Sequence, residues 1–136
     1  MTDIQELNLN YKKPSKKERR AYKKRRKETR KKLKRMAKTY GPWDWGYLQD
    51  FIKVIINDMY DYYNEGVNVW QAESSRLKVV NQLLKAQDLL DEIDKFENMD
   101  YEIEDFKSVD DYHIAEQKAY DDFYTFLGKN IRWWWD

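Results

Sequence analysis

The sequence contains no cysteine and one histidine, His113, in 136 residues. The lack of cysteine excludes disulfides, thiolate zinc sites and a cysteine nucleophile. A di-iron carboxylate bundle needs a Glu-x-x-His motif on each of two helices, whereas here the one histidine precedes Glu116. A mononuclear site of His113 and nearby acids is the alternative to an ordinary position on a helix surface or at a helix start. We favour the surface position and expect no metal or other cofactor.

Glycine is also scarce, and its four copies are isolated from one another. No glycine-rich phosphate loop or nucleophile elbow can be built from them. The acid pairs Asp110–Asp111 and Asp121–Asp122 could in principle serve acid–base catalysis, but neighbouring residues on a helix point apart. We therefore predict that the protein is not an enzyme.

Long apolar runs are missing as well. The stretch FIKVIIND is interrupted by Lys53 and falls far short of the roughly 18 residues that a membrane span needs. The first residues, MTDIQELNLN, lack the basic and apolar regions of a signal peptide. These features predict a soluble, cytoplasmic protein without a membrane partner.

Charge is abundant but unevenly distributed. Residues 1–38 contain 17 Lys or Arg and 4 Asp or Glu, a net charge of +13. Residues 39–136 contain 9 Lys or Arg and 21 Asp or Glu, a net charge of −12. Such an asymmetry between two parts of a chain points to an interaction function.

The basic segment begins with helix signals. Residues 1–14 have no helical period and are predicted to be a flexible leader, and residues 15–40 a basic helical arm. Ser15 opens a capping box with Glu18. The apolar stripe of the arm is thin and its middle is bare, so we expect residues 16–28 to project and only the last part to pack. An alternative is that the arm folds back along the acidic body.

Residues 41–128 are predicted to form a helical bundle domain. Gly41-Pro42 stops the arm, Asp44 caps a helix that ends at Gly66, and a further helix runs to about Phe96. An acidic loop follows, and Ser108 opens a last helix that ends at Gly128. The first of these helices has an apolar seam with alternating spacings of three and four residues, and neighbouring apolar residues widen it, so we expect it to be the central, most buried helix. The seam consists of Trp45, Leu48, Ile52, Ile55, Met59 and Tyr62. The predicted fold is all-α, an antiparallel three-helix bundle preceded by the basic arm, with four helices in total. Its core draws on 22 aromatic residues, and residues 129–136 form a Trp-rich tail.

The arm has two interpretations. Its cations could neutralise nucleic-acid phosphates, or the acidic body could neutralise them within the chain or in a second copy. Ten residues are candidates for contacts with DNA or RNA, including one ring that could stack on a base: Lys16, Lys17, Arg19, Arg20, Tyr22, Lys23, Lys24, Arg25, Arg26 and Arg30.

The acidic body and the tail supply candidates for a protein partner. The acids could be an ordinary solvated surface, could dock a basic protein, or could mimic phosphates. Three consecutive tryptophans cannot all face one core, so we expect at least one to be exposed unless a partner covers it. Tryptophan is enriched at interfaces, which favours a partner. Alternatively, two of them fold back to cap the bundle end with Trp43 and Trp45. The partner-binding candidates are Trp133, Trp134, Trp135, Asp88, Asp91, Glu92, Asp94, Glu102, Glu104 and Asp105.

The stretch GPWDWGYLQDFIKVIINDMYDYYNEGVNVWQ resembles small uncharacterised helical proteins of tailed bacteriophages, over roughly residues 30–95. In those proteins a short basic helix leads into a Pro-aromatic-Asp-aromatic-Gly turn. The resemblance implies a phage origin, action in the host cell cytoplasm and binding to host macromolecules, including those of defence systems. It carries no catalytic residue.

The leading hypothesis is thus a non-enzymatic, phage-type protein that docks a host or defence protein through its acidic and aromatic surfaces, with the arm adding affinity. The alternatives are a DNA- or RNA-binding protein led by the basic helix, and an acidic mimic of nucleic acid. A homo-oligomer is compatible with each of them.

Overall fold

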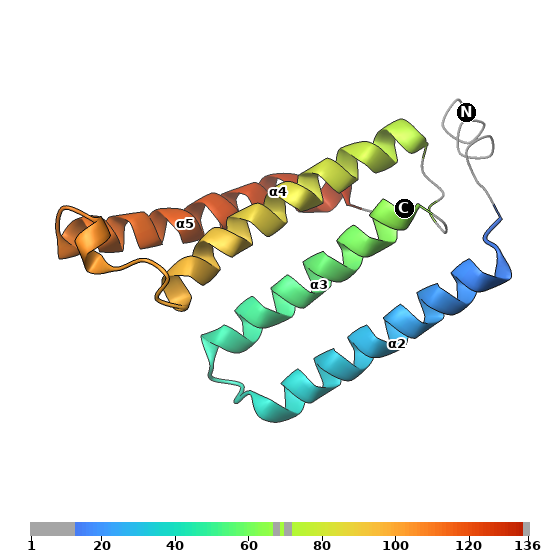
Figure 1. Ribbon diagram of the computed structural model, residues 1–136, viewed down its shortest axis with the longest axis horizontal. Helices are drawn as coiled ribbons and strands as arrows, with labels where there is room; N and C mark the ends of the chain where they lie inside the picture. The colour runs from blue at the N-terminus through green and yellow to red at the C-terminus, as the bar shows by residue number, and fades with distance from the viewer. Residues whose placement is uncertain (1–12, 67–68, 70–71, 135–136) are drawn as a thin grey trace. The chain divides into compact units, whose positions relative to one another are not determined.

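The computed structural model describes residues 13–66, 69 and 72–134. Within these residues the chain is all-α and contains no strand (Figure 1). Its elements are α2 (Lys16–Thr39), α3 (Trp45–Glu65), α4 (Glu73–Glu97), α5 (Val109–Asn130) and the short 3-10 helices η1 (Ile103–Asp105) and η2 (Ile131–Trp133). Most of the predicted leader lies outside the described residues. No described helix is both long enough and apolar enough to cross a bilayer.

The helix starts follow from local side-chain chemistry. The hydroxyls of Ser15 and Ser108 each accept a hydrogen bond from the amide three residues later, both at 3.1 Å. The carboxylate of Asp44 accepts one from the amide two residues later at 2.9 Å. Each bond satisfies an amide that the first turn of a helix leaves unpaired. The three predicted caps are confirmed.

The helix ends agree with the prediction at one glycine and not at the other. Gly66 ends α3 with φ of 68°, in the left-handed region that suits glycine. Gly128, predicted to end the last helix, lies inside α5, which continues to Asn130. That prediction was wrong because a glycine within an exposed turn weakens a helix by only about 1 kcal/mol and does not break it.

The chain divides into two compact units, residues 1–83 and residues 84–135, and the boundary falls within α4. In the first unit α2 and α3 lie antiparallel and side by side (Figure 1). The Arg76 guanidinium of α4 donates to the backbone carbonyl of Tyr63 at 2.7 Å, which ties the start of α4 to the end of α3. The buried apolar residues of this unit are Ile56, Tyr63, Val69, Ala72, Val79, Val80 and Leu83.

The most buried helix is α4, and the prediction that favoured α3 was wrong. Seven apolar residues of α4 are buried, against Ile56 and Tyr63 in α3. The first two residues of the predicted seam of α3, Trp45 and Leu48, are 64% and 60% exposed. A regular apolar period therefore identified α3 as a helix without showing which neighbour would cover it.

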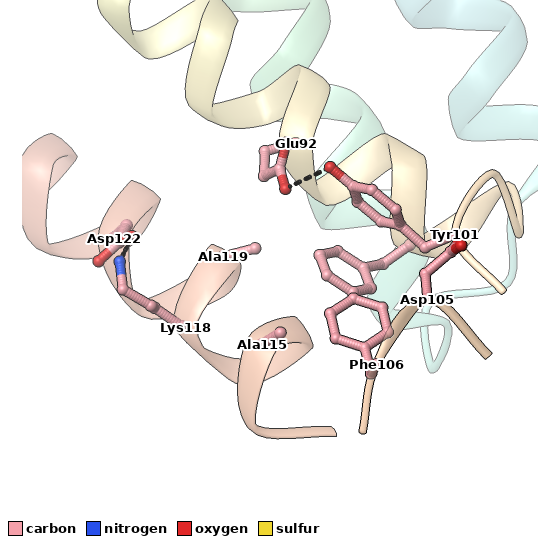
Figure 2. Close-up of a pocket in the computed structure, with 9 residues that line it drawn as sticks. Glu92, Tyr101, Asp105, Phe106, Ala115, Lys118, Ala119 and Asp122 are labelled. Atoms are coloured by element: carbon pink, nitrogen blue, oxygen red, sulfur yellow. Dashed lines mark hydrogen bonds and ion pairs between the residues drawn. The ribbon is translucent and has the colours of Figure 1, made fainter. Parts of the chain in front are cut away.

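In the second unit α5 runs antiparallel to the end of α4. The Lys85 ammonium lies 5.2 Å from the ring centroid of Phe126, and the rings of Phe96 and Tyr112 are 5.5 Å apart. A cavity of about 410 Å³ opens between α4, η1 and α5 (Figure 2). The buried residues of this unit are Ala86, Leu90, Ile93, Phe96, Ala119, Phe123 and Trp134.

Two tyrosines of α5 have perturbed acidity. The hydroxyl of Tyr120 donates to a carboxylate oxygen of Glu97 at 2.7 Å. Burial, and then this hydrogen bond, raise the pKa of Tyr120 well above its ordinary value of 10.0. Burial also raises the pKa of Tyr124, and the charge of Glu97 adds to this effect.

Candidate nucleic-acid interface and acidic pocket

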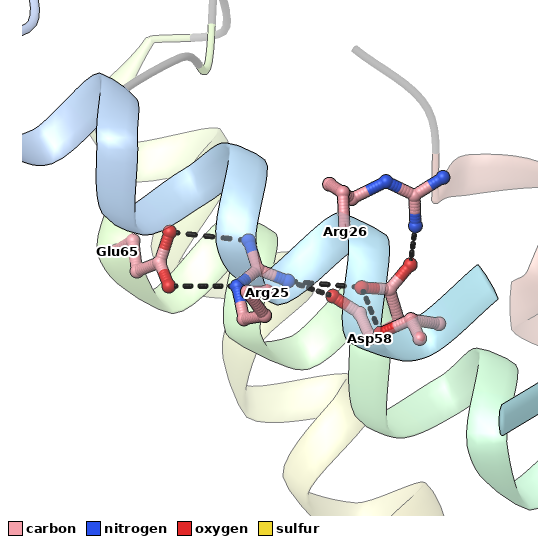
Figure 3. Close-up of polar contacts among 5 residues, drawn as sticks. Arg25, Arg26, Asp58 and Glu65 are labelled. Atoms are coloured by element: carbon pink, nitrogen blue, oxygen red, sulfur yellow. Dashed lines mark hydrogen bonds and ion pairs between the residues drawn. The ribbon is translucent and has the colours of Figure 1, made fainter. Parts of the chain in front are cut away.

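The inner face of α2 is held by an arginine that reaches two carboxylates of α3 (Figure 3). The Nη1 atom of Arg25 donates to Oδ1 of Asp58 at 2.9 Å. On its other side, Nη2 of Arg25 donates to Oε2 of Glu65 at 3.1 Å, and Nε lies 3.0 Å from Oε1. Asp58 and Glu65 are seven residues apart, two helical turns, so both lie on one face of α3.

A second arginine completes this cluster. Arg26 pairs with the other carboxylate oxygen of Asp58, and the hydroxyl of Thr29 lies 3.5 Å from Oδ1. The side chain of Asp58 is only 12% exposed. Nearby, the pKa of Asp61 is raised, chiefly by burial, while the positive charge of Arg25 opposes that rise. The cluster is thus a partly shielded ion network.

This network occupies the bare middle of the apolar stripe. The half-buried residues of α2 are Tyr22, Arg25, Arg26, Thr29, Leu33 and Met36. Tyr22 packs on Tyr62 with ring centroids 6.4 Å apart. The expectation that residues 16–28 project is wrong for residues 22–28, because two arginines paired with α3 acids take the place of apolar side chains. Residues 16–21 are all exposed.

The outer face of α2 carries the remaining cations. The helix contains 15 Lys or Arg, and all of them except Arg25 and Arg26 are exposed. Among the residues that the structure describes, none of these 13 is in an ion pair with a carboxylate. They include seven predicted contacts, Lys16, Lys17, Arg19, Arg20, Lys23, Lys24 and Arg30, and six that were not singled out, Lys27, Lys31, Lys32, Lys34, Arg35 and Lys38.

The acidic charge belongs mainly to the other unit. Residues 1–83 contain 20 Lys or Arg and 10 Asp or Glu, a net charge of +10. Residues 84–135 contain 6 Lys or Arg and 14 Asp or Glu, a net charge of −8. The unit that carries α2 is thus strongly basic even after its own acids are counted.

The structure brings two of the seven predicted acidic contacts, Glu92 and Asp105, to one pocket in the second unit (Figure 2). Asp88, Asp91, Asp94, Glu102 and Glu104 do not line it. Aromatic rings form much of its wall, and neither the rings nor Lys118 was singled out from the sequence. The full lining is Glu92, Phe96, Tyr101, Asp105, Phe106, Ala115, Lys118, Ala119 and Asp122.

The carboxylates of this pocket are partly engaged. Tyr101 donates to Glu92 at 2.9 Å, and this hydrogen bond is the main cause of the raised pKa of Tyr101. Asp105 accepts from the backbone amide of Glu102 at 2.9 Å, and Lys118 pairs with Asp122 at 2.5 Å. Rings and carboxylates together suit a cationic group. The ammonium of Lys95 already uses part of this setting, because it lies 3.5 Å from Oε2 of Glu92 and 5.9 Å from the ring centroid of Tyr101.

The tryptophan tail is divided between core and solvent. Trp134 is buried and packs on Phe126 with ring centroids 6.3 Å apart, whereas Trp133 is 60% exposed. Trp135 lies outside the described residues. Trp43, in the first unit, is 86% exposed. The predicted alternative, a cap that the tail shares with Trp43 and Trp45, stays a prediction.

His113 lies on the first turns of α5, as predicted, with its side chain 64% exposed. Its Nδ1 atom is 3.7 Å from a carboxylate oxygen of Glu116. In the described part of the chain no three His, Asp or Glu side chains gather into a metal-binding group.

Comparison of the chain with protein-family models, with curated proteins and with solved structures finds no match.

Proposed function

We propose that the protein binds nucleic acid through the outer face of α2. The observation that carries this proposal is the division of α2: two arginines pair with α3, while 13 cations remain exposed and outside described ion pairs. Lys and Arg on such a face can neutralise phosphates and release counterions, which gives affinity without sequence preference. A helix of 24 residues is about 36 Å long, enough to follow a backbone over many phosphates.

Anchoring of α2 on α3 adds to the argument. A free helix with so many like charges would repel itself and would be only marginally stable. Arg25 and Tyr22 hold α2 against α3, so most of the conformational entropy of α2 is lost when the protein folds and not when it binds its ligand. The outer cations are then presented in a fixed array before the ligand arrives.

The test is binding of a fluorescent oligonucleotide across a salt series, followed by anisotropy. A variant with Arg19→Gln, Lys23→Gln and Arg30→Gln loses three exposed cations and keeps the contacts to α3. We expect weaker binding and a salt slope smaller by about two to three, because each lost phosphate contact contributes about 0.7 to 0.9.

The matched control is Lys78→Gln, Lys107→Gln and Lys129→Gln, which lowers the net charge by the same three units at exposed positions outside α2. It is expected to retain most of the affinity and nearly the full slope. Equal effects of the two triple variants would mean that only net charge matters, and the proposal would be wrong.

The second candidate function, docking of a host or defence protein, is favoured by the acidic pocket. We propose that the pocket takes a Lys or Arg side chain of a basic partner. The resemblance to tailed-phage proteins supports a host macromolecule as the target. That the protein has no catalytic activity stays a prediction.

Calorimetry with a short Lys/Arg peptide tests this candidate. Glu92→Gln and Asp105→Asn should weaken binding, whereas the matched pair Asp88→Asn and Asp91→Asn, also on the acidic unit but outside the pocket, should not. An equal loss with both pairs would indicate diffuse charge attraction and no pocket.

The finer fold, an antiparallel three-helix bundle of residues 41–128, also stays a prediction, supported by the antiparallel course of α4 and α5.

A further inference from the structure

The turn between α2 and α3 exposes two large aromatic side chains. Trp43 is 86% exposed and Trp45 is 64% exposed, and Trp43 has the largest exposed fraction among the large apolar side chains that are exposed in the described residues. Both belong to the first unit, and neither exposure is explained by the core. Tryptophan is enriched among the residues that carry most of the energy at binding surfaces, so the two side chains are candidates for a contact.

The turn that carries them is well defined. The backbone amide of Asp44 donates to the carbonyl of Gly41 at 3.0 Å, and Asp44 caps α3. On the arm side, Tyr40 bonds to the carboxylate of Asp50, and its ring stacks on Tyr47 with centroids 5.6 Å apart. The backbone on both sides of Trp43 is therefore held by contacts, so its ring is presented from a fixed base.

The ring of Trp43 also lies directly over Gly41. A Cβ atom placed on Gly41 would come within 2.5 Å of Cζ2 of the Trp43 ring. Only glycine at position 41 permits this close approach. The benzene edge of the Trp43 indole lies against the backbone of Gly41, and most of the side chain is exposed to solvent.

The surroundings of the turn are basic. The last turns of α2 bring the exposed cations Lys34, Arg35 and Lys38 to the residues just before it. Asp44 is the acid within the turn, and its carboxylate is engaged in capping α3. A row of cations that leads to exposed aromatic rings is the combination that binds single-stranded nucleic acid, with phosphates along the cations and bases stacked on the rings.

We propose that Trp43, with Trp45 beside it, stacks unpaired bases, so that the ligand of the α2 face is single-stranded nucleic acid. This inference rests on the proposed function and specifies its substrate class. A duplex keeps its bases stacked on one another and offers no free base face to the rings, so the rings contribute to binding of a single strand and not of a duplex.

The experiment compares a fluorescent 20-nucleotide oligothymidylate with a duplex of 20 base pairs, using the full-length protein and anisotropy. Trp43→Ala should weaken binding of the single strand about tenfold and leave duplex affinity within about twofold, because stacking on one aromatic ring is worth about that factor per base. Trp43→Phe should restore part of the loss. Gly41→Ala, which displaces the ring without removing it, should also weaken single-strand binding.

The matched control is Trp133→Ala, which removes a tryptophan of comparable exposure to Trp45 from the other unit and should leave both affinities unchanged. Circular dichroism establishes that each variant is folded. An unchanged single-strand affinity of Trp43→Ala, or an equal loss for single strand and duplex, would overturn the inference.

The triple variant of the outer α2 face separates this inference from the proposed function. If that variant weakens binding while Trp43→Ala does not, α2 binds phosphates and the stacking role is wrong. If neither variant weakens binding of either ligand, both proposals are wrong.

Discussion

Replacing Asp58 by asparagine tests whether the ion network holds α2 to α3. The substitution keeps the size of the side chain and removes the charge that Arg25 and Arg26 share. Arg25 would keep Glu65, but Arg26 would lose the carboxylate that it contacts. Two guanidinium groups would then lie side by side with one acid fewer between them.

The cost can be bracketed from the burial of the groups. Breaking a fully buried pair by removing one partner costs about 3–5 kcal/mol, whereas an exposed pair contributes at most about 1 kcal/mol. Asp58 is close to the first case with 12% exposure, and Arg26 is closer to the second with 34%. We therefore expect Asp58→Asn to lower the free energy of unfolding by about 2 kcal/mol.

Urea denaturation followed by circular dichroism measures this change. With a slope of about 2 kcal/mol per molar urea, the midpoint should fall by about 1 M. Combining Asp58→Asn with Arg26→Gln in a double-mutant cycle isolates the coupling between the two side chains, and the double variant should lose less than the sum of the single losses.

An exposed pair elsewhere is the control. Lys118 and Asp122 lie 2.5 Å apart on α5, but their side chains are 72% and 44% exposed. Asp122→Asn should therefore cost only about 0.4 kcal/mol despite the short distance. If Asp58→Asn costs no more than Asp122→Asn, shielding does not strengthen the network and the reasoning is wrong.

Five further substitutions test three other features of the structure. Gly66 and Met99 both have positive φ, 68° and 59°, a backbone conformation that favours glycine. In urea denaturation, Gly66→Ala should therefore lower the free energy of unfolding by about 1 kcal/mol, and Met99→Gly should raise it by up to about 1 kcal/mol. Leu90→Ala should cost about 3 kcal/mol because the side chain is 1% exposed, and Leu84→Ala, at 39% exposure, should cost well under half as much in the same assay. Because the pKa of Tyr120 is raised above 10.0, the folded protein binds more protons than the unfolded chain at higher pH, so stability should fall as the pH rises above about 10. Tyr120→Phe should flatten that fall in thermal melts, and an identical pH dependence in the variant would contradict this assignment.

Local signals in the sequence predicted the helices well. Ser15, Asp44 and Ser108 each act on amides within three residues, so their effect does not depend on the rest of the fold. Gly128 failed as a helix end because a single glycine is only a weak signal. An added Cβ there would meet nothing within 4 Å, so neither a tight turn nor a close contact requires glycine at this position.

The contacts between helices were harder to predict because apolar periodicity ignores charged pairs. The middle of the α2 stripe looked bare, yet Arg25 and Arg26 fill it once Asp58 and Glu65 are placed opposite. The seven-residue spacing of those two acids on α3 was the available signal. Nor could the apolar pattern show that Trp134 would be the buried member of the tail, because three adjacent tryptophans have the same hydrophobicity.

The charges of α2 therefore serve two tasks that can be separated by experiment. The inward pair, Arg25 and Arg26, contributes to folding, whereas the outward cations are proposed to contribute to binding. Asp58→Asn removes a negative charge from the basic unit and leaves every outward cation in place. Well below its melting temperature, this variant should bind an oligonucleotide at least as tightly as the wild-type protein although it is less stable. The triple variant of the outer face should show the opposite, near wild-type stability with weakened binding, because removing like charges from a crowded helix relieves repulsion. A variant that lost both properties together would mean that the two faces of α2 do not act independently.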